Sequence, residues 1–413
     1  MTGKTILILG GGVGGIVAAN ELRLRLPRFH RVIIVEKDQD HAFAPSFLWL
    51  MTGDRRPERI VTPVSRLVRK GVEVVHAGVT AIDIAGRQVN TTQGTLAYDY
   101  LVIALGAQLA PEAIPGLKEG AYSFYTFEET IRLRDALSQF KGGIVALVVS
   151  SLPYKCPGAP HEAAMLIEDY FRGRGLLDKV QVQLYTPEPQ PMPVAGSQLG
   201  EAVTQMLTSK GIAFHPLHKL ISVDPQNYML SFDGKEPVSY DILIAIPPHR
   251  GPRIVREAGL ANEAGWVPVD RSTLKTKHGN VYAIGDITAI SIPGRWKPDV
   301  PMTLPKAGVF AHNQAEVVAQ RIVDEINGIA PKAEFCGPGY CMLEAGEGLA
   351  GFAFGDFFAE PSPKLELRNM GRAWHIGKVL FEQWWLSPFG FKKWFLRLTL
   401  NLGSKLMRIP VKM

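Results

Sequence analysis

The residues of this chain best suited to redox chemistry are its three cysteines, Cys156, Cys336 and Cys341. Cys156 lies in the loop Ser151–Pro160, just ahead of a helix that we expect to begin near His161. A helix N-terminus and the adjacent Lys155 favour a thiolate, so this position predicts a lowered pKa for the Cys156 thiol. A buried structural cysteine is the commoner alternative, but the surrounding proline and glycine indicate a loop. The sequence leaves open which of the other two cysteines meets Cys156.

A glycine motif, Gly10-x-Gly12-x-x-Gly15, could hold the phosphates of a dinucleotide. It follows an apolar strand predicted over 4–9 and opens a predicted helix, and the next strand, Arg31–Glu36, ends on an acid. Glycines let backbone N–H groups and the helix N-terminus approach a pyrophosphate, and the acid suits a ribose hydroxyl. Glycine turns also occur in proteins that bind no phosphate, but this order of elements favours a dinucleotide site.

A second glycine motif is missing where an enzyme with two dinucleotide sites would carry one. The strand predicted over Gly143–Ser150 runs directly into Ser-Leu-Pro-Tyr-Lys-Cys. Proline supplies no N–H to a phosphate, and the glycines needed for close approach are absent. The sequence therefore disfavours a nicotinamide cofactor, and electrons would enter through sulfur at Cys156.

Two later segments indicate which dinucleotide is bound. Leu101–Ala107, with Ala104 and Gly106, and Val281–Asp286 resemble the paired signatures of FAD-dependent proteins similar to the pyridine nucleotide-disulfide reductases. In those proteins the aspartate binds the ribityl hydroxyls of FAD, because a carboxylate accepts short charge-assisted hydrogen bonds. Asp286 could otherwise be a simple turn residue, but the combination of motifs predicts FAD.

Lys306 precedes a helix predicted from about Ala307 to Asn327. A positive side chain and a helix N-terminus together stabilise negative charge, which a reduced flavin carries. The alternative is a solvated lysine beside a helix cap. Because the other flavin-binding motifs occur in the same chain, a role of Lys306 at the flavin is favoured.

The predicted elements form two related α/β halves, each a Rossmann-like three-layer unit. The first would comprise residues 1–108 with 266–330 and bind FAD, and it includes a pair of strands around Val72–Val75 and Arg87–Thr92. The second, 109–265, would lack a nucleotide loop. The remainder, 331–413, would carry redox cysteines and a membrane-binding segment.

The composition fits a large folded enzyme. The chain has 413 residues, is 46% hydrophobic and 20% charged, and carries a formal net charge of +6, so it can bury a core. No arginine-rich block points to nucleic acid, and the cysteine spacing does not resemble a metal site. We expect no cleavable signal peptide and no membrane-spanning helix.

The C-terminal tail, 376–413, combines aromatic and basic residues with a single acid, Glu382. On a helix starting near Phe389, one apolar face would oppose basic side chains such as Lys393 and Arg397; the apolar face comprises Phe391, Phe395, Leu398 and Leu402. This pattern favours a helix lying in the membrane interface with a basic face toward anionic headgroups. The alternatives are docking on the chain's own core or on a partner subunit.

These motifs together resemble the family of sulfide:quinone oxidoreductases and flavocytochrome c sulfide dehydrogenases over nearly the whole chain. The resemblance rests on the first glycine motif and on four further segments, Phe43–Gly53, Lys155–Pro160, Pro305–Ala311 and Tyr340-Cys341. It implies that Cys156 and Cys341 are a redox pair facing the flavin, with Glu162 as an acid–base group and His161 beside it. Lys37, Pro45 and Val79 would be further FAD contacts, and Tyr340 would lie on the quinone side.

The sequence also departs from that family. Several members carry another active cysteine before the loop that corresponds to Lys155–Pro160, where this chain reads Ser123–Phe127. No cysteine occurs near residue 45, so FAD would be non-covalent, in contrast to the flavocytochrome branch. Cys336 is an extra thiol without an assigned role.

We therefore predict a peripheral membrane flavoprotein that oxidises sulfide to sulfur or polysulfide and passes two electrons to quinone, with a possible homo-oligomer. The nearest alternative is a type II NADH:quinone oxidoreductase. A third is an FAD-binding interaction protein without turnover. The sequence does not specify the quinone, the length of the sulfur chain or the membrane face.

Overall fold

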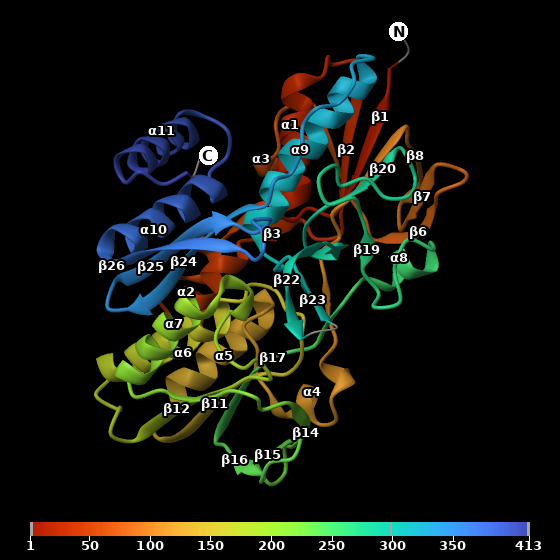
Figure 1. Cartoon of the computed structure of the whole chain (residues 1–413). Helices are drawn as coiled ribbons and strands as arrows, with labels where there is room; N and C mark the ends of the chain where they lie inside the picture. Colours follow the sequence, from red (N-terminus) through yellow and green to blue (C-terminus); the bar gives the residue numbers. More distant parts are fainter. Residues whose placement is uncertain (1–2, 298–299, 411–413) are drawn as a thin grey trace.

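A parallel five-stranded sheet forms the first half of the molecule. The computed structural model describes residues 3–297 and 300–410 (Figure 1). The sheet has the order β20-β9-β1-β2-β5, and its strands are β1 (Thr5–Leu9), β2 (Arg31–Glu36), β5 (Val72–His76), β9 (Tyr100–Ile103) and β20 (Val281–Ala283). Nearly continuous apolar runs suit strands that are covered on both faces.

Two different layers cover this sheet. Helices α1 (Val13–Arg25) and α9 (Gly308–Ile326) pack together on one face (Figure 1). The other face carries an antiparallel sheet made of β6 (Val79–Asp83), β7 (Gln88–Thr91) and β8 (Gly94–Ala97). Alternation along β1 places Ile6 and Ile8 in the core with the helices and Leu7 and Leu9 in the opposite core. The layering confirms the predicted α/β class.

One prediction about this region was wrong. The strands expected around Val72–Val75 and Arg87–Thr92 form, but they do not pair with each other. Strand β5 extends the parallel sheet beside β2, whereas β7 pairs with β6 and β8. Apolar and polar residues alternate too weakly along β5 for the sequence to show whether this strand is the edge of a parallel sheet or one arm of a hairpin.

The second half repeats the plan with a four-stranded parallel sheet, β13-β12-β11-β17. Its strands are β11 (Gly143–Val149), β12 (Val180–Tyr185), β13 (Ala213–His215) and β17 (Ile242–Ile246). Helices α5 (Phe127–Gln139), α6 (Ala159–Gly173) and α7 (Ser197–Ser209) pack on one face. The other face meets the antiparallel strands β14 (Leu220–Asp224), β15 (Met229–Phe232) and β16 (Val238–Ser239).

The C-terminal region adds an antiparallel sheet and two helices. Its strands are β24 (Pro338–Gly346), β25 (Leu349–Asp356) and β26 (Lys364–Gly371), and its helices are α10 (Arg372–Leu386) and α11 (Phe391–Leu406). Strand β24 lies between α6 and α10, so its alternate side chains face different neighbours. Leu343 and Ala345 join the core of the second half, whereas Tyr340 and Met342 pack with Trp374.

Short elements connect these layers. They are β3 (Asp40–Ala42), α2 (Phe47–Met51), β4 (Val61–Pro63), α3 (Val64–Leu67), β10 (Gln108–Leu109), α4 (Leu117–Gly120), β18 (His249–Arg250), α8 (Arg253–Glu257), β19 (Val267–Pro268), β21 (Thr288–Ala289), β22 (Ser291–Lys297) and β23 (Val300–Thr303). In the part of the chain that the structure describes, every helix is too short or too polar to cross a bilayer.

Candidate active site

The first glycine loop has the geometry of a pyrophosphate site. Gly10 has φ +101°, and a Cβ there would lie 2.4 Å from the Ala104 carbonyl oxygen. A Cβ at Gly15 would lie 1.8 Å from the Gly10 carbonyl oxygen, whereas one at Gly12 would meet nothing within 4 Å. Gly10 and Gly15 are therefore needed for the fold of the loop. Gly12 instead leaves open space at the N-terminus of α1, which favours a phosphate.

Glu36, at the end of β2, is held against this loop. Its carboxylate accepts hydrogen bonds from the backbone N–H groups of Gly11 and Asp38. A carboxylate fixed beside the glycine turn fits the expected contact with a ribose. The side chain of Lys37 instead points into solvent and pairs with Asp38 at 3.8 Å.

The remaining expected flavin contacts occupy several loops and edges. Val79 begins β6 and is partly buried, while Pro45 is exposed in the turn Ala44–Ser46. Gly106 has φ +64° just beyond β9, a conformation that favours glycine. The assignment of Pro45, Val79 and Gly106 as contacts of FAD therefore stays a prediction.

Asp286 offers a carboxylate for hydroxyl groups. It follows β20 and lines a small cavity with Lys306 and Gln314. No donor among the described residues makes a hydrogen bond to its side-chain oxygens. Burial raises the pKa of Asp286, although Lys155 and Lys306 act in the opposite direction. Acceptors without a protein partner fit the ribityl chain of FAD.

Lys306 is buried and held by backbone oxygens. Its Nζ donates to the Asp286 carbonyl at 2.6 Å and to the Thr288 carbonyl at 3.3 Å. The same atom lies 3.5 Å from the ring centre of Trp266. Burial lowers the pKa of Lys306 to about 8, although Asp286 raises it. A negative charge placed nearby would stabilise the protonated form, as expected for a reduced flavin.

The Cys156 loop is attached to the segment that carries Lys306. The backbone N–H of Cys156 donates to the Lys306 carbonyl at 2.7 Å, and Lys155 pairs with Lys306 in an isolated parallel bridge. Cys156 has φ +54°, a left-handed conformation that is unusual for this residue type. These contacts place the sulfur loop beside Asp286 and Lys306, although they lie far apart in the sequence.

Cys341, and not Cys336, approaches this loop. A Cβ added at Gly158 would lie 3.4 Å from the Cys341 Sγ, so the loop and β24 are in close contact there. Cys341 shares the α6-facing side of β24 with Leu343. Cys336 precedes the strand, is exposed, and makes a weak contact with the Glu334 carbonyl. The fold thus resolves a choice that the sequence left open.

The electrostatics of the Cys156 thiol differ from the expectation. The Cys156 side chain is exposed, but desolvation by the surrounding protein raises its pKa to about 12, and the Glu162 carboxylate adds to this effect. Burial likewise raises the pKa of Cys341. The expected lowering of the Cys156 pKa is wrong because burial, which is the larger effect, and the Glu162 carboxylate in the first turn of α6 both act against the helix N-terminus.

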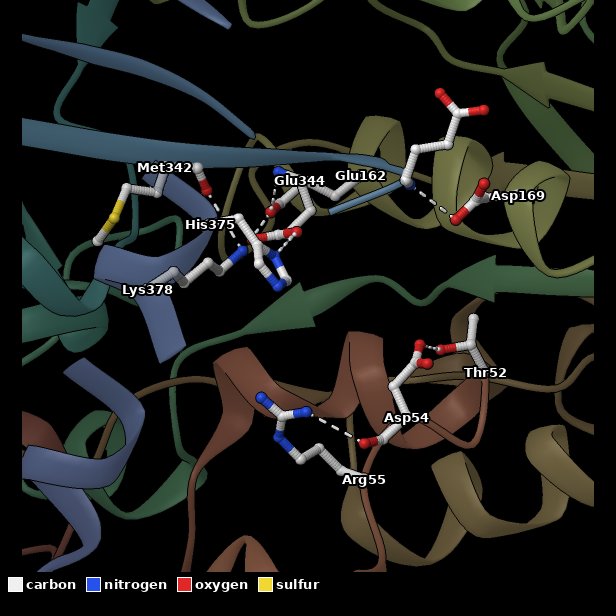
Figure 2. Close-up of polar contacts among 10 residues, drawn as sticks. Thr52, Asp54, Arg55, Glu162, Asp169, Met342, Glu344, His375 and Lys378 are labelled. Carbon is white, nitrogen blue, oxygen red and sulfur yellow. Dashed lines mark hydrogen bonds and ion pairs between the residues drawn. The ribbon is translucent and has the colours of Figure 1, made fainter. Parts of the chain in front are cut away.

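Glu162, Glu344, His375 and Lys378 form a charged cluster (Figure 2), and Glu162 and Lys378 lie close enough to act on both cysteines. Glu162 on α6 forms an ion pair with Lys378 on α10, and its Oε1 also accepts the Glu344 N–H at 2.9 Å. His375 Nδ1 lies 2.8 Å from Glu344 Oε2. Burial would lower the pKa of Lys378, but the Glu162 and Glu344 carboxylates outweigh it and raise the pKa. From the sequence, Lys378 is only one of several basic residues in the C-terminal tail, and no local signal marks it as buried.

His161 lies apart from this cluster. It is fully buried, packs edge-on against Phe214 with ring centres 6.2 Å apart, and neither ring nitrogen has a hydrogen-bond partner. Burial lowers its pKa to about 3, so the ring is neutral. Adjacent residues on a helix point about 100° apart, and this separates His161 from Glu162. The structure gives His161 a place in the core instead of the expected place beside the sulfur pair.

Tyr340 occupies the other side of β24 from Cys341. Its ring stacks on Phe352 with centres 6.2 Å apart, and burial raises its pKa. The successive positions of Tyr340 and Cys341 therefore face different layers. A role of Tyr340 toward quinone stays a prediction.

These features define a class: an α/β oxidoreductase fold with one dinucleotide loop and a cysteine loop in place of the other. Residues 4–315 match the family of pyridine nucleotide-disulphide oxidoreductases. The chain belongs to this family and is an FAD-dependent oxidoreductase.

Relatives with a more specific name cover most of the chain. The mitochondrial sulfide:quinone oxidoreductase of Mus musculus is 29% identical over 374 residues, which are 86% of this chain and 79% of that protein. The sulfide-quinone reductase of Aquifex aeolicus is 28% identical over 394 residues, covering 93% and 90%. The solved structure of the sulfide:quinone oxidoreductase from Aquifex aeolicus superposes with a TM-score of 0.84 at 26% identity, over 99% of this chain and 96% of that one.

Proposed function

We propose that this chain is a sulfide:quinone oxidoreductase that uses Cys156 and Cys341 as its sulfur relay. The observation that carries the proposal is the approach of the Cys341 sulfur to Gly158 in the Cys156 loop, which is itself hydrogen-bonded to Lys306 and lies near Asp286. The names of the relatives support the same substrates. The loop after β11, which lacks the Gly-x-Gly-x-x-Gly motif, supports sulfur, not a nicotinamide, as the point of electron entry.

The proposed reaction consumes hydrosulfide, quinone and one proton and yields sulfur at the oxidation level of the element and quinol. Hydrosulfide attacks a disulfide or sulfur-bridged form of the pair, so one S–S bond forms and another breaks. The sulfur from hydrosulfide stays on one cysteine as a persulfide, and the other cysteine leaves as a thiolate, which we assign to Cys341. Bound FAD supplies the two-electron acceptor and the link to quinone.

Glu162 serves as the proton acceptor of this site. Its carboxylate lies close enough to both thiols to raise their pKa values. It therefore favours the protonated thiols until the thiol proton is transferred. Lys378 counteracts this effect on both sulfurs. The pair thus sets how easily each thiolate forms, and substitution on either side should change the pH dependence of the sulfide reaction.

Quinone would approach from the membrane, with α11 lying on its surface. The apolar face predicted from the sequence is exposed in the structure; Phe391 is 77% exposed and Leu402 56%. An unpartnered apolar helix face of this length fits an interfacial helix. Replacing Phe395 and Leu398 by glutamate should abolish co-sedimentation with vesicles. Retained binding would refute this orientation.

An anaerobic titration tests the reaction. Sulfide should bleach the flavin absorbance of the purified protein, and a quinone analogue should restore it. Cys156→Ser and Cys341→Ser should each abolish the bleaching. Cys336→Ser is the matched control and should bleach like the wild type. Full activity of either active-site variant, or bleaching by NADH instead of sulfide, would overturn the proposal.

A further inference from the structure

A groove of about 280 Å³ lies between the helices of the FAD-binding half and the C-terminal helices. Its walls come from α1, α9, α10 and α11 and from the turn after α3. It is lined by apolar and aromatic side chains together with several charged ones, including Arg69, Trp384, Phe389, Lys393 and Trp394. None of these residues has a part in the proposed sulfur chemistry.

Two cations face each other in this groove without an acid between them. The guanidinium of Arg69 lies 4.7 Å from the ring centre of Phe389, and Lys393 Nζ lies 5.2 Å from the same ring. No carboxylate of the described residues pairs with either cation. Lys393 donates only to the carbonyls of Trp385 and Ser387, at 3.2 and 2.9 Å. Burial and the neighbouring Arg69 lower the pKa of Lys393 to about 8.

Two hydrogen-bond donors in the groove also have no acceptor among the described residues. They are the Arg69 Nε and the indole Nε1 of Trp384, and both atoms are buried. Trp384 is only 7% exposed. Buried donors without partners are uncommon, and here they accompany unneutralised positive charge. The missing partner is therefore an anion with several acceptor oxygens.

The acids of the groove are occupied elsewhere. Glu21 forms an ion pair with Arg25. Glu316 lies 3.6 Å from His312, and a hydrogen bond from His312 lowers the pKa of Glu316. Both carboxylates thus have partners on the α1 and α9 wall, and Arg397 of α11 also lowers the pKa of Glu316.

The groove borders the exposed apolar face of α11. Trp394 belongs to both, because it lines the groove and is 57% exposed. Phe395 and Leu398 continue that face and are 53% and 52% exposed. An anion whose apolar part continues along this face would satisfy the donors and cover the apolar surface at the same time.

We propose that this groove is a binding site for one anionic phospholipid, with its phosphate between Arg69, Lys393 and Trp384 and its acyl chains along α11. The inference rests on the proposed membrane contact of α11, but it adds a specific site to a general surface. A neutral quinone would leave both cations unpaired, and a free phosphate would leave the apolar border uncovered.

Binding of a soluble short-chain lipid to the FAD-loaded protein tests the site without a membrane. Dihexanoyl phosphatidylglycerol below its micelle concentration should bind once per chain. Arg69→Gln and Lys393→Gln should each weaken binding about tenfold or more, because each loses a charge-assisted hydrogen bond. Trp384→Phe, which keeps the ring and removes the indole N–H, should weaken it about threefold to tenfold.

Neighbouring exposed cations provide matched controls. Arg66→Gln and Lys392→Gln remove the same charges within three residues of the two site cations. Lys392 shares α11 with Lys393, and Arg66 lies on α3, just before the turn that carries Arg69. At high salt both should bind like the wild type, because screening removes long-range attraction. The site variants should stay weak. All variants should keep their flavin content and sulfide-dependent bleaching, so a failure of the lipid site is distinguishable from a failure of the enzyme.

Four outcomes would overturn the proposal. Equal losses in Lys392→Gln and Lys393→Gln would mean that binding reflects overall charge. The Arg69→Gln variant leaves α11 unchanged. Wild-type affinity in this variant would likewise mean that binding reflects overall charge and not the groove. Displacement of the lipid by inorganic phosphate at equal concentration would assign the site to a free anion, and displacement by a short-chain quinone would assign it to the substrate path.

Discussion

Replacing Lys378 by methionine should destabilise the protein strongly, because it leaves a buried carboxylate without its counter-ion. The side chains of Lys378 and Glu162 are only 9% and 3% exposed. Methionine keeps the length of the lysine stem and its apolar contacts. The change therefore removes little except the ammonium and its hydrogen bonds.

The expected loss follows from what remains around Glu162. Removing one partner of a buried pair costs about 3–5 kcal/mol. The Glu344 N–H still donates to Glu162, and a hydrogen bond to a charged group offsets part of that cost. We therefore expect the free energy of unfolding to fall by about 3 kcal/mol, at the lower end of the range for such pairs.

Urea unfolding of the flavin-free protein, followed by tryptophan fluorescence, measures this loss. The measurement is made near neutral pH. The raised pKa of wild-type Lys378 means that it binds more protons in the folded state at high pH, so its contribution to stability is present near neutral pH and is lost only in strong alkali.

A double variant separates the ion pair from simple damage to packing. Adding Glu162→Gln to Lys378→Met removes both charges, and most of the lost stability should return, because an uncharged buried pair carries no comparable penalty. A single-variant loss below about 1 kcal/mol, or losses that simply add in the double variant, would refute the reasoning. The first result would mean that Glu162 is solvated, and the second that the two charges do not interact.

Three further outcomes follow from the site. Glu162→Gln should lower the pKa of Cys156, so iodoacetamide should label the Cys156 peptide faster at pH 8, as counted by mass spectrometry; unchanged labelling would remove the carboxylate from the thiol environment. Gly15→Ala should lose flavin absorbance and lower the melting temperature of the flavin-free protein, because a Cβ would lie 1.8 Å from a carbonyl oxygen. Gly12→Ala should lose flavin but keep that melting temperature. His161→Leu should keep sulfide-dependent bleaching within about twofold, and a tenfold loss would mean that His161 is a catalytic residue. The variant should also lose less stability than the wild type between pH 6.5 and 3. The folded pKa of about 3 makes the wild-type protein less stable as the pH falls through that window.

Much of the cofactor half could be predicted because its signals are local. The glycine motif, the acid at the end of β2 and the aspartate after β20 each depend on a few neighbouring residues and a strand that ends there. Helix α9 and strand β12 have periodic or apolar patterns long enough to fix their type. Local signals also identified the missing second glycine loop and the exposed apolar face of α11.

The charged residues near the cysteines could not be predicted in the same way. Lys378 lies among basic residues near the C-terminus, and nothing beside it distinguishes a buried ammonium from a solvated one. Glu162 was named, but its effect on Cys156 had the opposite sign to the expected helix effect. The pKa of a thiol depends on every charge and every desolvating atom near it, and most of these come from distant segments.

The sequence by itself determined that this chain carries one dinucleotide glycine motif, a cysteine loop where a second nucleotide loop would lie, and an amphipathic segment in its C-terminal tail. These are properties of short segments. Only the tertiary structure decided that Cys341 and not Cys336 approaches the Cys156 loop, that His161 belongs to the core, and that Arg69 and Lys393 line the same groove. Each of these pairings joins segments separated by many residues, and which side chains meet depends on strand register and helix rotation, which are set when the layers pack.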